Sequence, residues 1–199
     1  MAGGNFSLQH AHDFPERLLG VVIVGQLFPF DAGIEGLRPP YMQRLLASAI
    51  NSSEKVLGFL TRGGAAYLNR VGPKRFYQML ISDSDTDQKT LETDEFMTTM
   101  AHGISSAAAQ GHLGYFSDYR EIVPDPMEKL LAIDAPVRVM ISGQAKAEEA
   151  ANLRHAIELK PNFKEKFLED AGTFLFFSHH KHVVDSIEEV AVAAGVKPE

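Results

Sequence analysis

The sequence has 199 residues, 45% of them hydrophobic and 23% charged, which is enough for one domain with a sizeable core. The formal net charge of −7, without a block of basic residues, argues against nucleic acid or an anionic membrane surface as the main partner. The chain has no Cys, which excludes disulfides, thiol nucleophiles and thiolate metal sites. No apolar run is long enough for a membrane span and the first residues do not resemble a secretory signal, so we expect a cytoplasmic protein.

Three segments have the composition of buried strands: residues 19–25, 136–142 and 163–168. The first two are almost continuously apolar, as is typical of parallel strands that are covered on both faces. Helical patterns come before and after the segment 136–142. The sequence therefore predicts an α/β fold with about three parallel strands and flanking helices.

Between the first two strands the sequence is almost entirely helical in pattern. We expect helices over residues 54–69 and 74–81, a polar turn at 82–87, and a longer helix through 91–109 with Thr93 or Asp94 near its start. This organisation predicts an elbow helix, first strand and loop in residues 1–38, a mostly helical cap in 39–124, and a strand-helix-strand-helix core in 125–199, all within one structural unit.

The last segment, residues 180–194, predicts a terminal helix with one apolar face. We expect five of its side chains to point inward: Val183, Val184, Ile187, Val190 and Ala191.

This order of elements resembles the C-terminal half of the α/β-hydrolase fold with its cap. In that family a G-x-S-x-G-G nucleophile elbow opens a helix that ends in A-x-x-x-P-E-R-[VL] before a strand. Gly3-Gly4, Ala11 and residues 15–18 fall on this pattern. Further matches lie at Asp125-Pro126, Pro136–Val139, Gly143, Pro161 and 171–176, and in the cap at Arg62-Gly63, 84–87 and 110–114. The resemblance covers essentially the whole chain and implies hydrolysis of small ester, lactone or halide-type substrates under a helical lid, without a cofactor.

The same comparison places other residues where the family has its catalytic triad. Met1 stands at the nucleophile, Lys146 at the acid and Thr173 at the base. Loss of the nucleophile or the base alone costs on the order of 10⁶ in turnover. We therefore expect a truncated, hydrolase-like protein that is inactive as this chain, without a metal.

Two residues are weak candidates for relocated chemistry. Asp31 follows the first strand, where some members of the family carry the acid, and His179 follows the position of the missing base. His179, His180 and His182 could also hold a metal, but a solvated helix start is the favoured interpretation. Backbone N–H groups at Ala2 and Gly3 could retain an anion-binding pocket beside the first helix.

Two alternatives to an inactive hydrolase stay open at this point. One is a non-catalytic module that binds a small ligand or another protein, and the other is a fragment of an active hydrolase. The unpaired edge of the strand 19–25 predicts a homodimer or pairing with a complementary chain. An apolar ligand would contact aromatic side chains of the loops and lid: Phe28, Phe30, Tyr115, Phe116 and Tyr119.

Overall fold

The computed structural model describes residues 3–25, 54–80, 84–109, 131–144 and 147–196. The chain divides into two compact units, one formed by 1–40 with 125–199 and the other by 41–124. Each unit is described below by itself.

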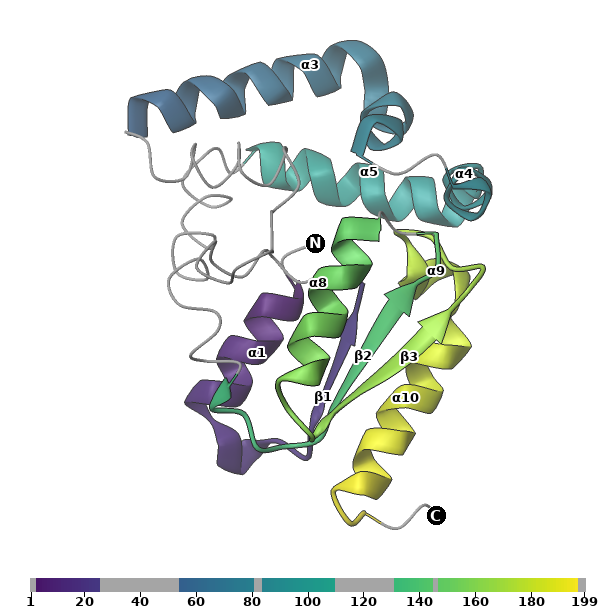
Figure 1. Cartoon of the computed structure of the whole chain (residues 1–199). Coiled ribbons are helices and arrows are strands. Elements are labelled where there is room, and N and C mark those ends of the chain that lie inside the picture. The colour runs from purple at the N-terminus through teal and green to yellow at the C-terminus, as the bar shows by residue number, and fades with distance from the viewer. Residues whose placement is uncertain (1–2, 26–53, 81–83, 110–130, 145–146, 197–199) are drawn as a thin grey trace. The chain divides into compact units, whose positions relative to one another are not determined.

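The first unit contains a sheet of three parallel strands in the order β1-β2-β3 (Figure 1). They are β1 (Val21–Val24), β2 (Val137–Ser142) and β3 (Phe163–Leu168). In the register of the sheet, Val21 lies opposite Val137 and Val137 lies opposite Phe163. The predicted α/β fold with three parallel strands is confirmed, with β1 and β2 beginning slightly later than expected.

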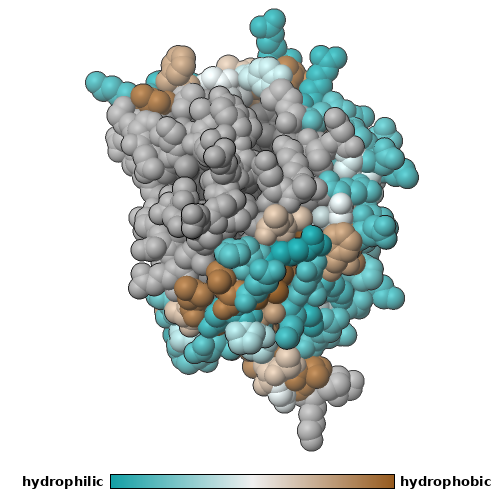
Figure 2. All heavy atoms as spheres, viewed as in Figure 1, coloured by the Kyte–Doolittle hydropathy of each residue, from teal (hydrophilic) through white to brown (hydrophobic). Residues whose placement is uncertain are grey.

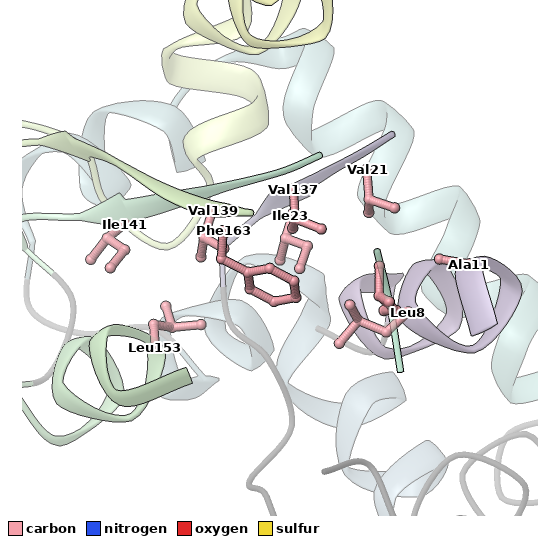
Figure 3. Packing of buried hydrophobic residues seen from close by; sticks show 10 residues of the cluster. Leu8, Ala11, Val21, Ile23, Val137, Val139, Ile141, Leu153 and Phe163 are labelled. Carbon is pink, nitrogen blue, oxygen red and sulfur yellow. The ribbon is translucent and has the colours of Figure 1, made fainter. Parts of the chain in front are cut away.

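Helices cover both faces of this sheet. On one face, α1 (Gly3–Asp13) and α8 (Ala147–Glu158) pack on the odd-numbered residues of β1 and β2. Figure 3 shows Leu8 and Ala11 of α1 and Leu153 of α8 directed at the side chains of the strands. On the other face, α10 (His180–Ala193) packs on the even-numbered residues, and Met140 lies in that cluster. A short helix, α9 (Leu175–Ser178), precedes α10, and a 3-10 helix, η1 (Pro15–Arg17), joins α1 to β1.

The orientation of α10 about its own axis is set by one acidic side chain. Glu189 accepts from Arg138 of β2 at 2.8 Å and from Lys166 of β3 at 3.0 Å, so its side of the helix faces β3. Val183 and Val190 are buried as predicted.

Two of the residues expected to point inward from α10 do not. Val184 is 52% exposed and Ile187 is 54% exposed, so the prediction is wrong for this pair. The physical reason is that the ion pairs hold the Glu189 side against the sheet, which turns these two positions outward on the opposite side of the helix.

The second unit is helical. The helix α3 (Glu54–Leu80) bends at Gly72, which has a φ of 80° and precedes Pro73, and α5 (Asp94–Ala109) packs against it. Tyr77 and Phe96 meet edge to face with their ring centroids 5.8 Å apart, and the Tyr77 hydroxyl donates to the Met100 carbonyl at 3.2 Å.

A third helix, α4 (Asp85–Leu91), lies where a polar turn was predicted at 82–87. The Ser84 hydroxyl accepts from the backbone N–H of Asp87 at 3.2 Å, so the polar residues cap and begin a helix. The longer helix starts at Asp94, one of the two residues expected near its start.

In the view of Figure 2, the described surface is mostly hydrophilic, and the hydrophobic atoms occur in small groups. No helix within the described ranges is both long enough and apolar enough to cross a bilayer.

Substitution of Phe163 tests how tightly the core between the sheet and its helices is packed. Its side chain is 2% exposed, and we expect Phe163→Ala to lower the free energy of unfolding by about 3–5 kcal/mol because it removes contacts and leaves a cavity. The matched control is Phe176→Ala in the same unit, where the ring is 58% exposed and the expected change is below about 1 kcal/mol. Urea unfolding followed by circular dichroism measures both, and equal losses would contradict this packing.

Glu189 gives the protein a predictable response to acid. The hydrogen bond from Lys166, followed by the charge of Arg138, lowers the pKa of this carboxyl below its ordinary value of 4.5, against the opposing effect of desolvation. A lowered folded-state pKa contributes stability that is present above the ordinary value and is lost as the pH falls through the folded-state pKa. The carboxylate is 43% exposed, so we expect at most about 1 kcal/mol.

The measurement is the free energy of unfolding of Glu189→Gln relative to the unsubstituted chain at pH 7 and at pH 3. The difference between the two proteins should shrink at pH 3. The control is Glu188→Gln at the neighbouring exposed position of the same helix. A Glu189→Gln effect that does not change with pH would contradict the ion pairs.

Candidate functional site

The segments that follow the three strands meet at one edge of the sheet, as expected where parallel strands end. They are Gly25 after β1, residues 142–144 at the end of β2, and residues 169–173 after β3. The helix α1 begins with Gly3 at this same edge (Figure 1). This edge is therefore the place to look for a site.

Hydrogen bonds join the exits of β2 and β3. The Gly143 N–H donates to the Leu168 carbonyl at 2.7 Å, and the Gln144 N–H donates to the Ala171 carbonyl at 3.1 Å. The buried Ser142 hydroxyl donates to the same Ala171 carbonyl. These bonds fix the two loops relative to each other through the backbone.

Gly143 is required at this junction by a close approach of the two chains. A Cβ atom at this position would lie 2.6 Å from Cα and 2.7 Å from the carbonyl carbon of Glu169. Backbone atoms cannot move aside as the end of a flexible side chain can. Only glycine therefore fits the first position of the loop that, by the resemblance, should carry an acid.

Thr173, which the resemblance predicts at the position of the family's base, lies at the same edge. It is half-buried and lies between the buried Gly172 and Phe174, the residue that caps α9. A threonine hydroxyl does not titrate near neutral pH, whereas the imidazole of a histidine does. The structure thus places Thr173 in the loop that is hydrogen-bonded to the loop beginning at Gly143.

A second group of polar side chains lies around His179, just before α10. Its Nδ1 is 2.8 Å from the Ser178 hydroxyl oxygen, and its Nε2 is 3.1 Å from an Asp170 carboxylate oxygen. The His182 ring stacks on it at 6.0 Å. The His179 side chain is only 12% exposed, so it differs from the solvated helix start that the sequence favoured, whereas His180 is exposed.

The hydrogen bonds of His179 define the roles of its two nitrogens in the neutral ring. A carboxylate can only accept, so Nε2 carries the proton and Nδ1 accepts from the Ser178 hydroxyl. The hydroxyl, the imidazole and the carboxylate thus form a hydrogen-bonded chain, which is the arrangement that activates a catalytic serine.

Three features limit the chemistry of this series. Asp170 is 83% exposed, so water screens its charge and its hold on the ring is weak. Ser178 also lies 3.4 Å from the Phe174 carbonyl, a competing acceptor for its proton. Finally, Ser178 and His179 are adjacent in the chain and end a four-residue helix, not a strained elbow.

The sequence suggested His179 but not its partner Asp170. Asp170 follows β3 and His179 precedes α10, nine residues later. Their contact depends on how the chain folds back through α9, a helix that no periodicity in the sequence predicted. The usable signal was the cluster of histidines at 179–182.

Metal binding finds no support in the part of the chain that the structure describes, because no three of its His, Asp and Glu side chains are grouped as ligands. The remaining site predictions lie outside the described residues and stay predictions. They are Met1, Ala2, Phe28, Phe30, Asp31, Tyr115, Phe116, Tyr119 and Lys146.

A shallow hollow of about 440 Å³ lies at the other end of the strands. Leu18 and Leu19, which lead into β1, and Pro136, which leads into β2, are among its lining residues. It is therefore remote from the loops that follow the strands and does not belong to the candidate site.

Comparison with known proteins supports a fold but not a family. No family model matches the sequence, and no curated protein matches it. Among solved structures, the chain is similar to a probable hydrolytic enzyme from Pseudomonas aeruginosa PAO1, with a TM-score of 0.50 and 14% sequence identity over 94% of this chain. The chain spans 60% of the length of that protein. At this identity the likeness concerns the fold alone.

Substitution of Gly143 tests whether the junction of the two loops depends on close backbone packing. We expect Gly143→Ala to lower the free energy of unfolding by about 1–3 kcal/mol, because the added Cβ overlaps the backbone of Glu169. The control is Gly103→Ala in α5, where a Cβ meets nothing within 4 Å and alanine should be neutral or stabilise by up to about 1 kcal/mol. The measurement is the free energy of unfolding of both variants in denaturant. A Gly143→Ala protein as stable as the original would contradict the close contact between the two loops.

Proposed function

We propose that the chain belongs to the α/β-hydrolase superfamily and corresponds to its C-terminal part with a helical lid. The parallel order β1-β2-β3, the separate helical unit inserted between β1 and β2, and the motif residues around Gly3-Gly4 and Gly143 support this assignment. The hydrolase-like fold of the Pseudomonas protein is consistent with it. By this assignment, the substrates or ligands belong to the class of small esters, lactones or halides.

We further infer that the chain as it stands does not carry out the reaction of a hydrolase triad. The observation that carries this inference is Thr173 at the base position. Without a base, a serine hydroxyl is not deprotonated as it attacks, and removal of the base alone costs on the order of 10⁶ in turnover. The protein is then a hydrolase-like module that keeps the scaffold without the usual chemistry.

A second candidate is residual hydrolysis through Ser178, His179 and Asp170. Their hydrogen bonds of 2.8 Å and 3.1 Å favour it. The exposed carboxylate and the position of Ser178 at the end of a helix weigh against it. The inactive module is therefore the preferred proposal.

The test is hydrolysis of p-nitrophenyl acetate by the purified chain, compared with buffer and with the same protein after denaturation. Acylation of surface lysines gives a linear, non-saturating background, so the quantity to measure is saturable turnover over many equivalents of substrate. We expect none above background.

Two variants decide between the candidates. Saturable turnover that is lost in His179→Ala but retained in His180→Ala would overturn the proposal of inactivity and assign the reaction to the Ser178 group. Turnover that survives both substitutions would overturn the proposal and place the chemistry elsewhere in the chain.

A further inference from the structure

The two halves of α10 are attached to the sheet in different ways. The helix begins near the edge where the strands end and finishes near the edge where they begin (Figure 1). In its first half, Val183 is buried in an apolar cluster that includes Met140 of β2 and Leu175 of α9. None of these side chains titrates, so the attachment of the first half does not depend on pH.

The second half of the helix, residues 187–193, has few apolar contacts with the sheet. Only Val190 is buried among these residues, all of which the structure describes. Val190 packs against Gly20 just before β1, where there is no room for a Cβ atom. The other attachment of this half is through the carboxylate of Glu189, which pairs with β2 and β3. The hold of the sheet on residues 187–193 therefore depends to a large extent on one charge.

Each oxygen of the Glu189 carboxylate pairs with one cation. One oxygen lies 2.8 Å from an Arg138 guanidinium nitrogen, and the other lies 3.0 Å from Nζ of Lys166. The side chains of Arg138 and Lys166 are only 22% and 18% exposed. The buried Nε of Arg138 has no hydrogen-bond partner among the described residues. Two largely covered positive charges thus share a single carboxylate.

Protonation of Glu189 would disturb both contacts at once. A carboxylate only accepts hydrogen bonds, but a protonated carboxyl carries a donor on one oxygen, which then faces a cationic donor. The negative charge that compensates Arg138 and Lys166 is lost as well. The two cations then repel each other and are better hydrated when the helix moves away from them.

We propose that residues 187–193 are an acid-released segment of the fold. When Glu189 gains a proton, this half of α10 opens from β2 and β3 more often, while the first half stays packed on the sheet. The protein then responds to acid by a local opening at one end of one helix before the sheet itself unfolds.

No other charged group on the elements packed against α10 takes the place of this carboxylate in the described part of the chain. The strand β1 and the helix α9 carry no titratable residue. Lys164 lies on the same face of β3 and adds positive charge. On α10 itself, Asp185 is 3.8 Å from His182, and Glu188 is exposed.

The direction of the pH dependence follows from the carboxyl of Glu189. The hydrogen bond from Lys166, followed by the charge of Arg138, lowers its pKa below the ordinary value of 4.5, against the opposing effect of desolvation. The charge that holds residues 187–193 is therefore present at neutral pH and is lost as the pH falls through this lowered pKa. The release belongs to acid conditions.

Glu189→Gln imitates the neutral carboxyl at pH 7, without exposing the rest of the protein to acid. The side chain is 43% exposed, so the variant should fold. In native-state hydrogen exchange we expect the protection of the Val190 and Ala191 amides to fall by up to about 5-fold, and that of Val184 to stay unchanged. The unsubstituted chain at pH 3 should show the same pattern once each rate is divided by that of an unstructured chain at the same pH.

The matched control is Glu188→Gln at pH 7. It removes a carboxylate from the neighbouring exposed position, which forms no ion pair within the described residues. Both halves of α10 should keep the protection they have in the unsubstituted chain.

Thiol labelling gives an independent readout, because the chain has no Cys of its own. Val190→Cys and Val183→Cys place a single thiol at positions that are 7% and 6% exposed. Each rate is divided by the rate of the same variant in denaturant, which removes local effects on the reactivity of the thiol. Adding Glu189→Gln should speed labelling at position 190 and leave position 183 unchanged.

Three results would overturn the proposal. Equal loss of protection in both halves of α10 would show that the response is unfolding of the whole unit. Unchanged protection of Val190 in Glu189→Gln would show that the carboxylate does not hold this half of the helix. An equal loss in Glu188→Gln would show a general effect of charge in place of the two ion pairs.

Discussion

The unit that carries the sheet depends on β2, which is hydrogen-bonded on both sides and covered on both faces. Val139, Met140 and Ile141 are fully buried, as is typical of a central parallel strand. Arg138 is the charged residue of this strand, and its charge is compensated by Glu189 from α10. That compensation decides which side of α10 faces β3, and so which apolar residues of the helix are left outside the core.

The fold could be predicted from the sequence where the signal lies within one segment. The three strands are short apolar or alternating runs, and the bend of α3 follows from Gly72 with its φ of 80° before Pro73. The segment 82–87 was misjudged because the same polar residues suit both a turn and a capped helix start, and the bond from Asp87 to Ser84 selects the helix.

Predictions failed where the outcome depends on segments distant in the sequence. Both apolar rows of α10 have helical spacing, so its sequence does not distinguish Val183 and Val190 from Val184 and Ile187. The ion pairs with β2 and β3 make that choice. The meeting of Asp170 with His179 likewise requires the path of the chain through α9. The Gly143 junction lies between these cases, since the motif predicts the glycine but only the structure shows the backbone of Glu169 against it.

Backbone hydrogen bonds hold the candidate site together. The exits of β2 and β3 are joined by the backbone of Gly143, Gln144 and Ala171 and by the Ser142 hydroxyl. The architecture of this edge therefore rests largely on backbone groups, and architecture and chemistry can vary independently among proteins of one fold.

The composition of the outer strand β3 has a consequence for how far such a protein can assemble. A sheet with two open edges can add further sheets at both ends and grow into a fibre. Here Lys164, Glu165 and Lys166 place charges on the outer strand β3, which protects that edge from pairing with another sheet. Growth of the sheet beyond β3 is therefore disfavoured by the sequence of β3 itself.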